Sequence, residues 1–265
     1  MIPKTVKPTL RKGKQRLEFE LKLRIHSPLL IYQMGKVGSA SLLKSLEKFY
    51  PGAVVHAHYL INNPNWKIEK LYQQIVLRKK PINIISLTRE PIGRNVSAFF
   101  QNFERDTGVT YEKANFSIEE LKEIFMKNYK HQIPLNWFDK NIKYNFGIDV
   151  YEKEFPSCGI KTYTHDQVRL LVMKSEIDDS DKVDAIKSFL GLPEFELYSA
   201  NVSDLKDYSE TYKAFKNEVR FPLSYIERMC DSKYCKHFYS KDEIDAFKHR
   251  WIQPKKESIN NGNSV

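Results

Sequence analysis

Two periodicities of apolar residues alternate along the first two thirds of the chain. Short runs rich in apolar residues predict four buried strands, at 29–32, 54–59, 82–87 and 168–174. Apolar residues three or four positions apart predict four helices, at 41–50, 66–79, 92–103 and 181–190. Strands that alternate with helices favour an α/β fold with a parallel, P-loop-like sheet flanked by helices. Ligands of such sheets bind beyond the carboxyl ends of the strands.

Three further stretches fall outside this alternation. Residues 1–24 are rich in Lys and Arg, and apolar and charged residues alternate over 17–23, which predicts a basic N-terminal arm or an edge strand. Residues 106–149 read as a helical, aromatic insertion over the sheet. A helical, lysine-rich C-terminal part follows, and the polar tail 253–265 is predicted to be disordered. We therefore expect a single α/β domain over 25–252.

Composition narrows the class of partner. The formal net charge of +10 and a pI near 9.2 favour anionic partners. Nucleic acid is disfavoured because we find no zinc finger, helix-turn-helix or basic-aromatic platform. No apolar run reaches the length of a membrane span and no signal peptide is evident, so we expect a cytoplasmic protein, with peripheral membrane attachment left open. The three cysteines form no disulfide framework or zinc pattern.

A glycine-rich segment between the first strand and the first helix predicts a phosphate loop. It reads Gly-Lys-Val-Gly-Ser-Ala-Ser from Gly35 to Ser41. The glycines allow a tight turn, the helix start offers backbone N–H groups, and Lys36 adds a positive charge. A nucleoside-triphosphate P-loop would place the lysine after the second glycine, but Lys36 precedes Gly38, and no hydroxyl stands where the magnesium ligand belongs. An ordinary turn with serines capping the helix is the alternative.

The segment around the third strand predicts a second phosphate site. Arg89 stands at the strand end and Ser97 on the following helix, so a guanidinium and a hydroxyl could converge on one phosphate. Arg94 is either part of this site or a solvated helix residue. Two phosphate sites on neighbouring strands suggest one ligand with phosphates at both ends.

These motifs resemble those of sulfotransferases that use 3′-phosphoadenosine-5′-phosphosulfate. The loop from Lys36 resembles their 5′-phosphosulfate loop, and 88–100 is similar to their 3′-phosphate signature. The chain is similar in style to bacterial sulfotransferases of capsular polysaccharide synthesis. The loop and the His-x-His strand resemble heparan-type 2-O-sulfotransferases, matching Lys36, Ser39, Ser41, His56 and His58. The chain departs from these sulfotransferases at Ala40, where a residue with a hydroxyl is common, and over 106–149, which has no clear counterpart of their substrate-binding residues.

The resemblance implies the sulfotransferase fold, the phosphosulfate donor as co-substrate, no metal, and a glycan or polysaccharide acceptor. The donor would be bound by Lys36, Gly38, Ser39, Ser41, Arg89 and Ser97. His56 and His58 lie on one strand face, and one of them would be the general base, since histidine has a solution pKa of about 6.5. We favour His58, and Lys36 would neutralise the leaving phosphate. The alternatives are a P-loop nucleotide kinase or hydrolase, and a non-catalytic module that binds anionic ligands.

Overall fold

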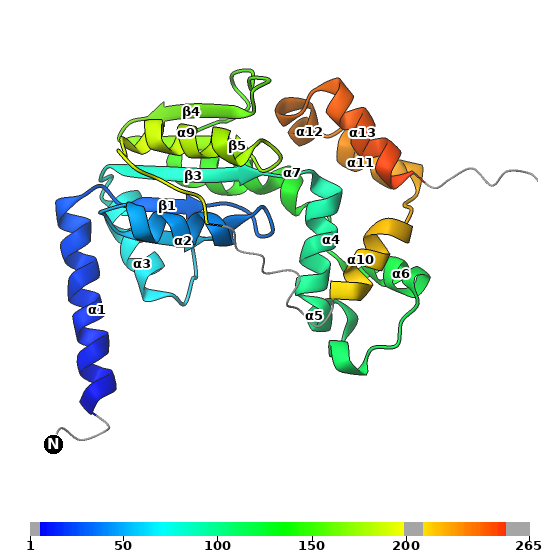
Figure 1. The fold of residues 1–265 in the computed structure, drawn as a ribbon, viewed down its shortest axis with the longest axis horizontal. Coiled ribbons are helices and arrows are strands. Elements are labelled where there is room, and N and C mark those ends of the chain that lie inside the picture. The colour runs from blue at the N-terminus through cyan, green and yellow to red at the C-terminus, as the bar shows by residue number, and fades with distance from the viewer. Residues whose placement is uncertain (1–5, 199–208, 253–265) are drawn as a thin grey trace, which may run out of the picture.

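A five-stranded sheet in the order β2-β1-β3-β5-β4 lies at the centre of the protein (Figure 1). The computed structural model describes residues 6–198 and 209–252. Its strands are β1 (Leu29–Tyr32), β2 (Val54–Ala57), β3 (Ile82–Thr88), β4 (Ile160–His165) and β5 (Val168–Lys174). The four strands β2, β1, β3 and β5 are parallel, and all four were predicted from their apolar runs.

The remaining strand corrects the expectation of a parallel sheet. β4 pairs antiparallel with β5 and forms one edge of the sheet. The two strands are joined by a tight turn at Asp166 and Gln167, where Asp166 has a positive φ of 49°. β4 has no fully buried residue, so its sequence carries lysine and threonine instead of a continuous apolar run. That polarity hid the strand, because edge strands that face solvent lack the apolar pattern of central ones.

Helices cover the sheet and extend to one side of it. They are α1 (Val6–Ile25), α2 (Ser39–Phe49), α3 (Trp66–Tyr72), α4 (Pro91–Gln101), α5 (Phe103–Thr107), α6 (Ile118–Asn128), α7 (Ile133–Phe138), α8 (Tyr144–Phe146), α9 (Asp179–Leu190), α10 (Ser209–Glu218), α11 (Leu223–Cys230), α12 (Lys233–Phe238) and α13 (Lys241–Trp251). Single turns of other helix types lie at Gln73–Leu77, Tyr111–Lys113 and Asp139–Lys143. The predicted helical character of 106–149 and of the C-terminal part is confirmed. The tail 253–265 lies outside the described residues.

The expected edge strand near the N-terminus is wrong, because Val6–Ile25 forms helix α1. The alternation over 17–23 misled the prediction, since only Phe19 is fully buried and Leu17 remains 62% exposed. Leu, Glu, Lys and Arg all have high helix propensity, which favours a helix when no sheet edge is paired. The ring of Phe19 packs edge-on against Trp66 of α3, with 5.2 Å between ring centroids.

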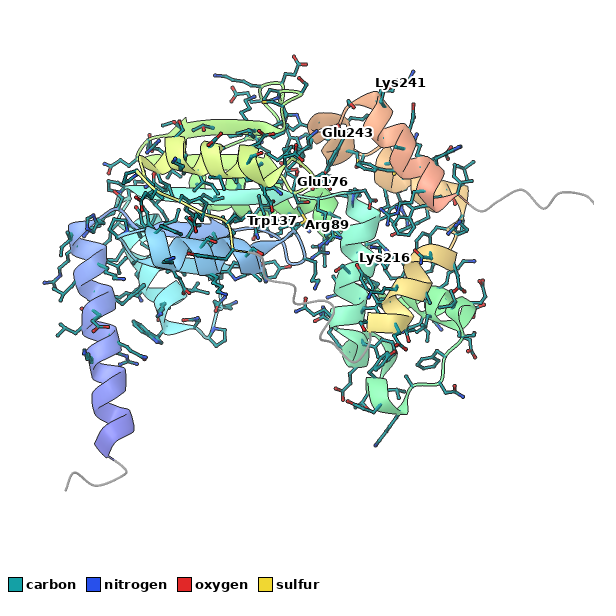
Figure 2. The ribbon with its side chains drawn as sticks, viewed as in Figure 1. Arg89, Trp137, Glu176, Lys216, Lys241 and Glu243 are labelled. Carbon is teal, nitrogen blue, oxygen red and sulfur yellow. The ribbon has the colours of Figure 1, made fainter. Side chains whose placement is uncertain are left out.

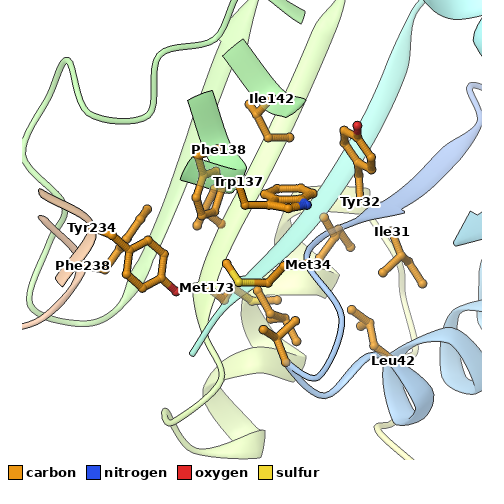
Figure 3. Packing of buried hydrophobic residues seen from close by; sticks show 14 of the residues in the cluster. Ile31, Tyr32, Met34, Leu42, Trp137, Phe138, Ile142, Met173, Tyr234 and Phe238 are labelled. Carbon is orange, nitrogen blue, oxygen red and sulfur yellow. The ribbon is translucent and has the colours of Figure 1, made fainter. Parts of the chain in front are cut away.

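Helix α4 carries three buried polar residues, Arg94, Asn95 and Ser97, in succession along its length. All residues from Pro91 to Phe100 are buried, so the helix is covered on every side. α4 leads from the end of β3 to the group of helices α5, α6 and α10 beside the sheet (Figure 1). α7 packs behind the sheet, where Trp137 contacts Tyr32 of β1 with ring centroids 5.0 Å apart and lies over Met34 (Figure 3).

Candidate functional site

The segment between β1 and α2, where the sequence predicts a phosphate loop, has two residues in the left-handed backbone conformation. Lys36 has a φ of 71° and Gly38 a φ of 98°, both in the left-handed region. Left-handed residues of this kind let successive N–H groups form a concave nest for an anion. Gly38 is the N-cap of α2, and no side chain caps the helix there. The interpretation of Ser39 or Ser41 as the N-cap is therefore wrong, since both lie within the first turn.

Two arginines bind the carbonyl groups of this loop from the protein side. Arg89 Nη1 donates to the carbonyl of Lys36 at 2.8 Å, and Arg94 Nε donates to the carbonyl of Gly35 at 2.8 Å. Arg89 follows β3 directly and Arg94 lies in the first turns of α4. The segment predicted to form a second phosphate site is thus hydrogen-bonded to the segment predicted to form the first, and the two form a single structural unit.

Arg94 is a buried clamp and not the solvated helix residue that was one interpretation of its position. Its side chain is only 4% exposed. Besides Gly35, its guanidinium bonds the side chains of Asn95 at 3.0 Å and Tyr129 at 2.8 Å, both through Nη1. Arg94 therefore joins the loop, α4 and the end of α6.

His58 has one ring nitrogen fixed and the other directed at the loop. Its Nδ1 lies 2.8 Å from the carbonyl of Gln33, which accepts the N–H proton and so leaves the lone pair on Nε2. A Cβ atom placed on Gly35 would lie 3.5 Å from Nε2, so this nitrogen faces Gly35. Burial lowers the pKa of His58, which keeps the ring neutral near pH 7 and able to accept a proton.

His56 is close to His58 but has a different environment. The two rings meet edge to face with centroids 4.7 Å apart, as expected from their spacing around the end of β2. His56 Nε2 is buried and has no hydrogen-bond partner among the described residues. Burial and the neighbouring His58 lower the pKa of His56 to about 4. Of the two histidines, His58 has the ring nitrogen that faces the loop, and the ring of His56 packs against it.

Ser97 lies on the same helix as Arg94, three residues further on, and is 8% exposed. Residues three apart are neighbours on a helix surface. The structure thus brings Lys36, Arg89 and His58 around one loop, and leaves the role of Ser97 a prediction.

Several residues that hold the site were not found from the sequence. The hydroxyl of Tyr234 accepts from the amide of Arg89 and donates to its carbonyl, both at 3.0 Å. Glu176 accepts from the amide of Glu90 at 2.8 Å, and both Arg89 and Glu176 lie where the sheet meets α4 (Figure 2). Gln33, fully buried, accepts from the amide of Leu87 at 3.0 Å. No local pattern could reveal Tyr234, which is 145 residues from Arg89.

Glu90 could have been found from its neighbours. Its carboxylate accepts from the amides of Ile92 at 2.8 Å and Gly93 at 2.6 Å, and it is the N-cap of α4. A capping residue followed by proline at the first helical position is a recognised start signal. Burial raises the pKa of Glu90, while the two amide bonds oppose that rise.

A cavity of about 210 Å³ borders the loop on the side of α2 and α9. Gly38 and Ser41 line one wall, Leu87 and Ser175 lie at the ends of β3 and β5, and Lys182 lines the α9 side. The cavity therefore occupies the carboxyl edge of the parallel strands, where ligands of such sheets bind. Pockets that enclose a whole drug-sized ligand measure about 300 Å³ or more, so this one has room for part of a nucleotide.

In residues 6–198 and 209–252, no group of three or more His, Cys, Asp or Glu is placed to hold a metal ion. Cys158, Cys230 and Cys235 are all free thiols. None of the described helices is both long enough and apolar enough to cross a bilayer.

Comparison with known proteins points to a role connected with glycans. Residues 110–240 match the NKWYS family, described as "Putative capsular polysaccharide synthesis protein". The matched segment is just under half of the chain and includes α6, α7, β4, β5, α9, α11 and α12, but not the phosphate loop. No curated protein and no solved structure matches the chain.

Proposed function

We propose that this protein is a sulfotransferase that moves a sulfuryl group from 3′-phosphoadenosine-5′-phosphosulfate to a hydroxyl of a glycan or polysaccharide. The observation that carries the proposal is the hydrogen bond from Arg89 to the carbonyl of Lys36. It joins the two segments that the sequence assigns to opposite ends of one doubly phosphorylated ligand.

The donor would lie along the loop. The N–H groups at the start of α2, with Lys36, Ser39 and Ser41, would bind the 5′-phosphosulfate. Arg89 and Ser97 would bind the 3′-phosphate, because a guanidinium and a hydroxyl give charge-assisted and geometrically fixed contacts. The cavity between α2 and α9 borders Gly38 and Ser41, which supports a place for the nucleoside there.

The transfer step would use His58 as the base. The acceptor hydroxyl gives its proton to His58 Nε2, and its oxygen forms a bond to sulfur. The bond between sulfur and the bridging oxygen breaks, and the electron pair stays on the phosphate of adenosine 3′,5′-bisphosphate. Lys36 would stabilise the charge that develops on this oxygen, which lowers the barrier because the interaction strengthens in the transition state.

The glycan acceptor is supported by the family match over residues 110–240. This segment supplies Tyr129, which bonds Arg94, and Trp137, whose Nε1 donates to the carbonyl of His58 at 3.3 Å. The matched part of the chain therefore adjoins the proposed base, as an acceptor-binding region should.

The test separates this proposal from a nucleotide kinase or hydrolase and from a binding module. Calorimetry compares adenosine 3′,5′-bisphosphate with ATP–Mg²⁺, and we expect the bisphosphate to bind more tightly. A preference for ATP–Mg²⁺ would overturn the proposal. A transfer assay with sulfur-labelled donor then screens capsular and glycosaminoglycan-like polysaccharides. Tight bisphosphate binding without transfer to any of them would favour the binding module.

A further inference from the structure

A second cavity, of about 670 Å³, lies between Tyr59 and the helices α6, α7 and α11. It shares no lining residue with the cavity beside α2 and α9. Its walls include Tyr129, Trp137 and Asn136, together with the three cations Lys130, Lys140 and Arg228.

Three of the lining residues connect this cavity to the proposed base and to the loop. Tyr59 follows His58 in the chain, and Trp137 donates a hydrogen bond to the carbonyl of His58. Tyr129 accepts from Arg94, which in turn donates to the carbonyl of Gly35. The 670 Å³ cavity therefore lies beside the proposed base, where the acceptor would bind. The 210 Å³ cavity proposed for the nucleoside lies on the α2 side of the loop.

The charges around this cavity favour an anionic ligand. Lys130, Lys140 and Arg228 are exposed, and none of the described residues that line the cavity is acidic. Within the described ranges, no carboxylate forms an ion pair with any of the three. Three unpaired cations at one opening attract negative charge more strongly than the same cations would if each were neutralised.

Tyr59 adds an apolar surface to these charges. Its side chain is 52% exposed, although large aromatic side chains usually bury most of their area. An exposed aromatic ring beside polar groups suits a sugar ring, which has apolar C–H faces and polar edges. A single-stranded nucleic acid would instead need several aromatic platforms for successive bases. One exposed ring with three cations fits an acidic sugar chain better.

We propose that this cavity binds the acceptor and that the acceptor is an acidic oligosaccharide, with carboxylate groups on its sugars. Tyr59 stacks on a sugar ring, and Lys130, Lys140 and Arg228 pair with the carboxylates. This inference rests on the proposed function for its link to catalysis, but binding of the sugar chain can be measured without turnover.

The experiment measures binding to the full-length protein with oligogalacturonate of eight sugars as the probe and its methyl ester as the neutral control. We expect the acid to bind at least about 10-fold more tightly than the ester, with an affinity that falls as salt is added. The triple variant Lys130→Gln, Lys140→Gln and Arg228→Gln is expected to lose about 10-fold in affinity for the acid. Tyr59→Ala is expected to weaken both probes.

A charge-matched control variant distinguishes a local site from general attraction to a basic protein. Lys153→Gln, Lys236→Gln and Lys241→Gln removes the same number of exposed positive charges outside the cavity and should bind the acid within about twofold of wild type. Equal loss in both triple variants, equal binding of acid and ester, or tighter binding of a single-stranded oligonucleotide that depends on the same three cations would each overturn the inference.

Failure of the proposed function has a different signature. If the wild-type protein does not bind adenosine 3′,5′-bisphosphate but binds oligogalacturonate through the three cations, the donor assignment is wrong and the sugar site stands. The opposite outcome is that the bisphosphate binds equally well to wild type and to the cavity triple variant, and that oligogalacturonate also binds both with the same affinity. In that case the sugar site is wrong and the donor site stands.

Discussion

The hydroxyl of Tyr234 bonds both the amide and the carbonyl of Arg89, at 3.0 Å each. Tyr234 lies on α12 and is fully buried, so a residue of the C-terminal helices fixes the backbone at the end of β3. The side chain of Arg89 reaches the phosphate loop from this fixed point. The hydroxyl of a distant residue therefore holds the backbone of Arg89.

Tyr234→Phe should lower both stability and donor affinity. The change leaves one N–H and one carbonyl of Arg89 without their partner, which costs about 1–3 kcal/mol of unfolding free energy. Thermal unfolding and calorimetry with adenosine 3′,5′-bisphosphate measure the two effects. Tyr144→Phe is the control, since Tyr144 is 72% exposed and should be neutral in both measurements. Unchanged bisphosphate affinity in Tyr234→Phe would show that Arg89 does not need this support.

Arg89→Ala should weaken binding of the bisphosphate by about 2–4 kcal/mol, because it removes a charge-assisted contact to a phosphate in a crevice. Ser97→Ala should cost less, and Arg89→Lys should recover only part of the loss, since an ammonium cannot replace the planar fork. The matched control is Arg105→Ala, whose side chain is 62% exposed and pairs with Asp106. Wild-type affinity in both Arg89→Ala and Ser97→Ala would refute the 3′-phosphate assignment.

His58→Ala should lower turnover by about 10²–10⁴-fold with donor affinity nearly unchanged, because a general base acts on the transition state. His56→Ala should lose less rate, and part of that loss should follow from weaker packing against His58. Because burial lowers the pKa of His58, the acid limb of the rate profile should lie below pH about 6.5. Near wild-type turnover of both variants on a confirmed acceptor would place the base elsewhere.

Gly35→Ala and Gly38→Ala should separate rate from stability. A methyl group on Gly35 would make ordinary contact with His58 Nε2 at 3.5 Å, so the protein should fold while the acceptor loses access to the base, and turnover should fall at least about 10-fold. Gly38 has a φ of 98°, where a side chain costs about 1–2 kcal/mol, so Gly38→Ala should lower the unfolding free energy. Denaturant unfolding and transfer kinetics on both variants measure the two effects. Equal loss of unfolding free energy in Gly35→Ala and Gly38→Ala would contradict the prediction.

The partly buried His56 predicts a loss of stability in acid. Its pKa falls from about 6.5 in an unfolded chain to about 4 in the folded protein. Protonation of His56 therefore favours unfolding. The unfolding free energy that depends on neutral His56 is fully present above pH 6.5, and about 3 kcal/mol of it is lost when the pH falls to 4. Denaturant unfolding at pH 7 and pH 4 measures this effect. Between these two pH values the unfolding free energy of His56→Gln should fall by about 3 kcal/mol less than that of wild type. The exposed His249→Gln should behave as wild type, and an identical loss in all three proteins would show that His56 does not titrate in this way.

The parts of the fold that the sequence predicts are those whose residues bury a continuous apolar face. β1, β3 and β5 follow from such runs, and α2 and α9 from apolar residues three or four apart. α1 and β4 were missed because each exposes most of its length, so burial leaves only a weak pattern. For β4 the antiparallel pairing also depends on a turn of two residues that no apolar pattern records.

The candidate site divides in the same way. Lys36, Arg89 and the histidine pair stand in short local motifs, so their types and spacing could be interpreted without a structure. Gln33, Tyr129 and Tyr234 act through contacts between distant segments, and their own neighbours in sequence carry no sign of them. The residues that we propose bind the ligand could thus be predicted from sequence motifs. The residues that hold these side chains in place could be found only from the structure.

The bond between Arg89 and Tyr234 also sets an order for folding. The loop and β3 are synthesised well before α12, since Tyr234 is translated 145 residues after Arg89. Contacts of such long sequence separation form late, since the intervening chain must be closed first. A nascent chain that already contains every proposed donor-binding residue would still lack the fixed backbone of Arg89. The ability to bind the donor should therefore arise abruptly, only once α12 has left the ribosome and docked.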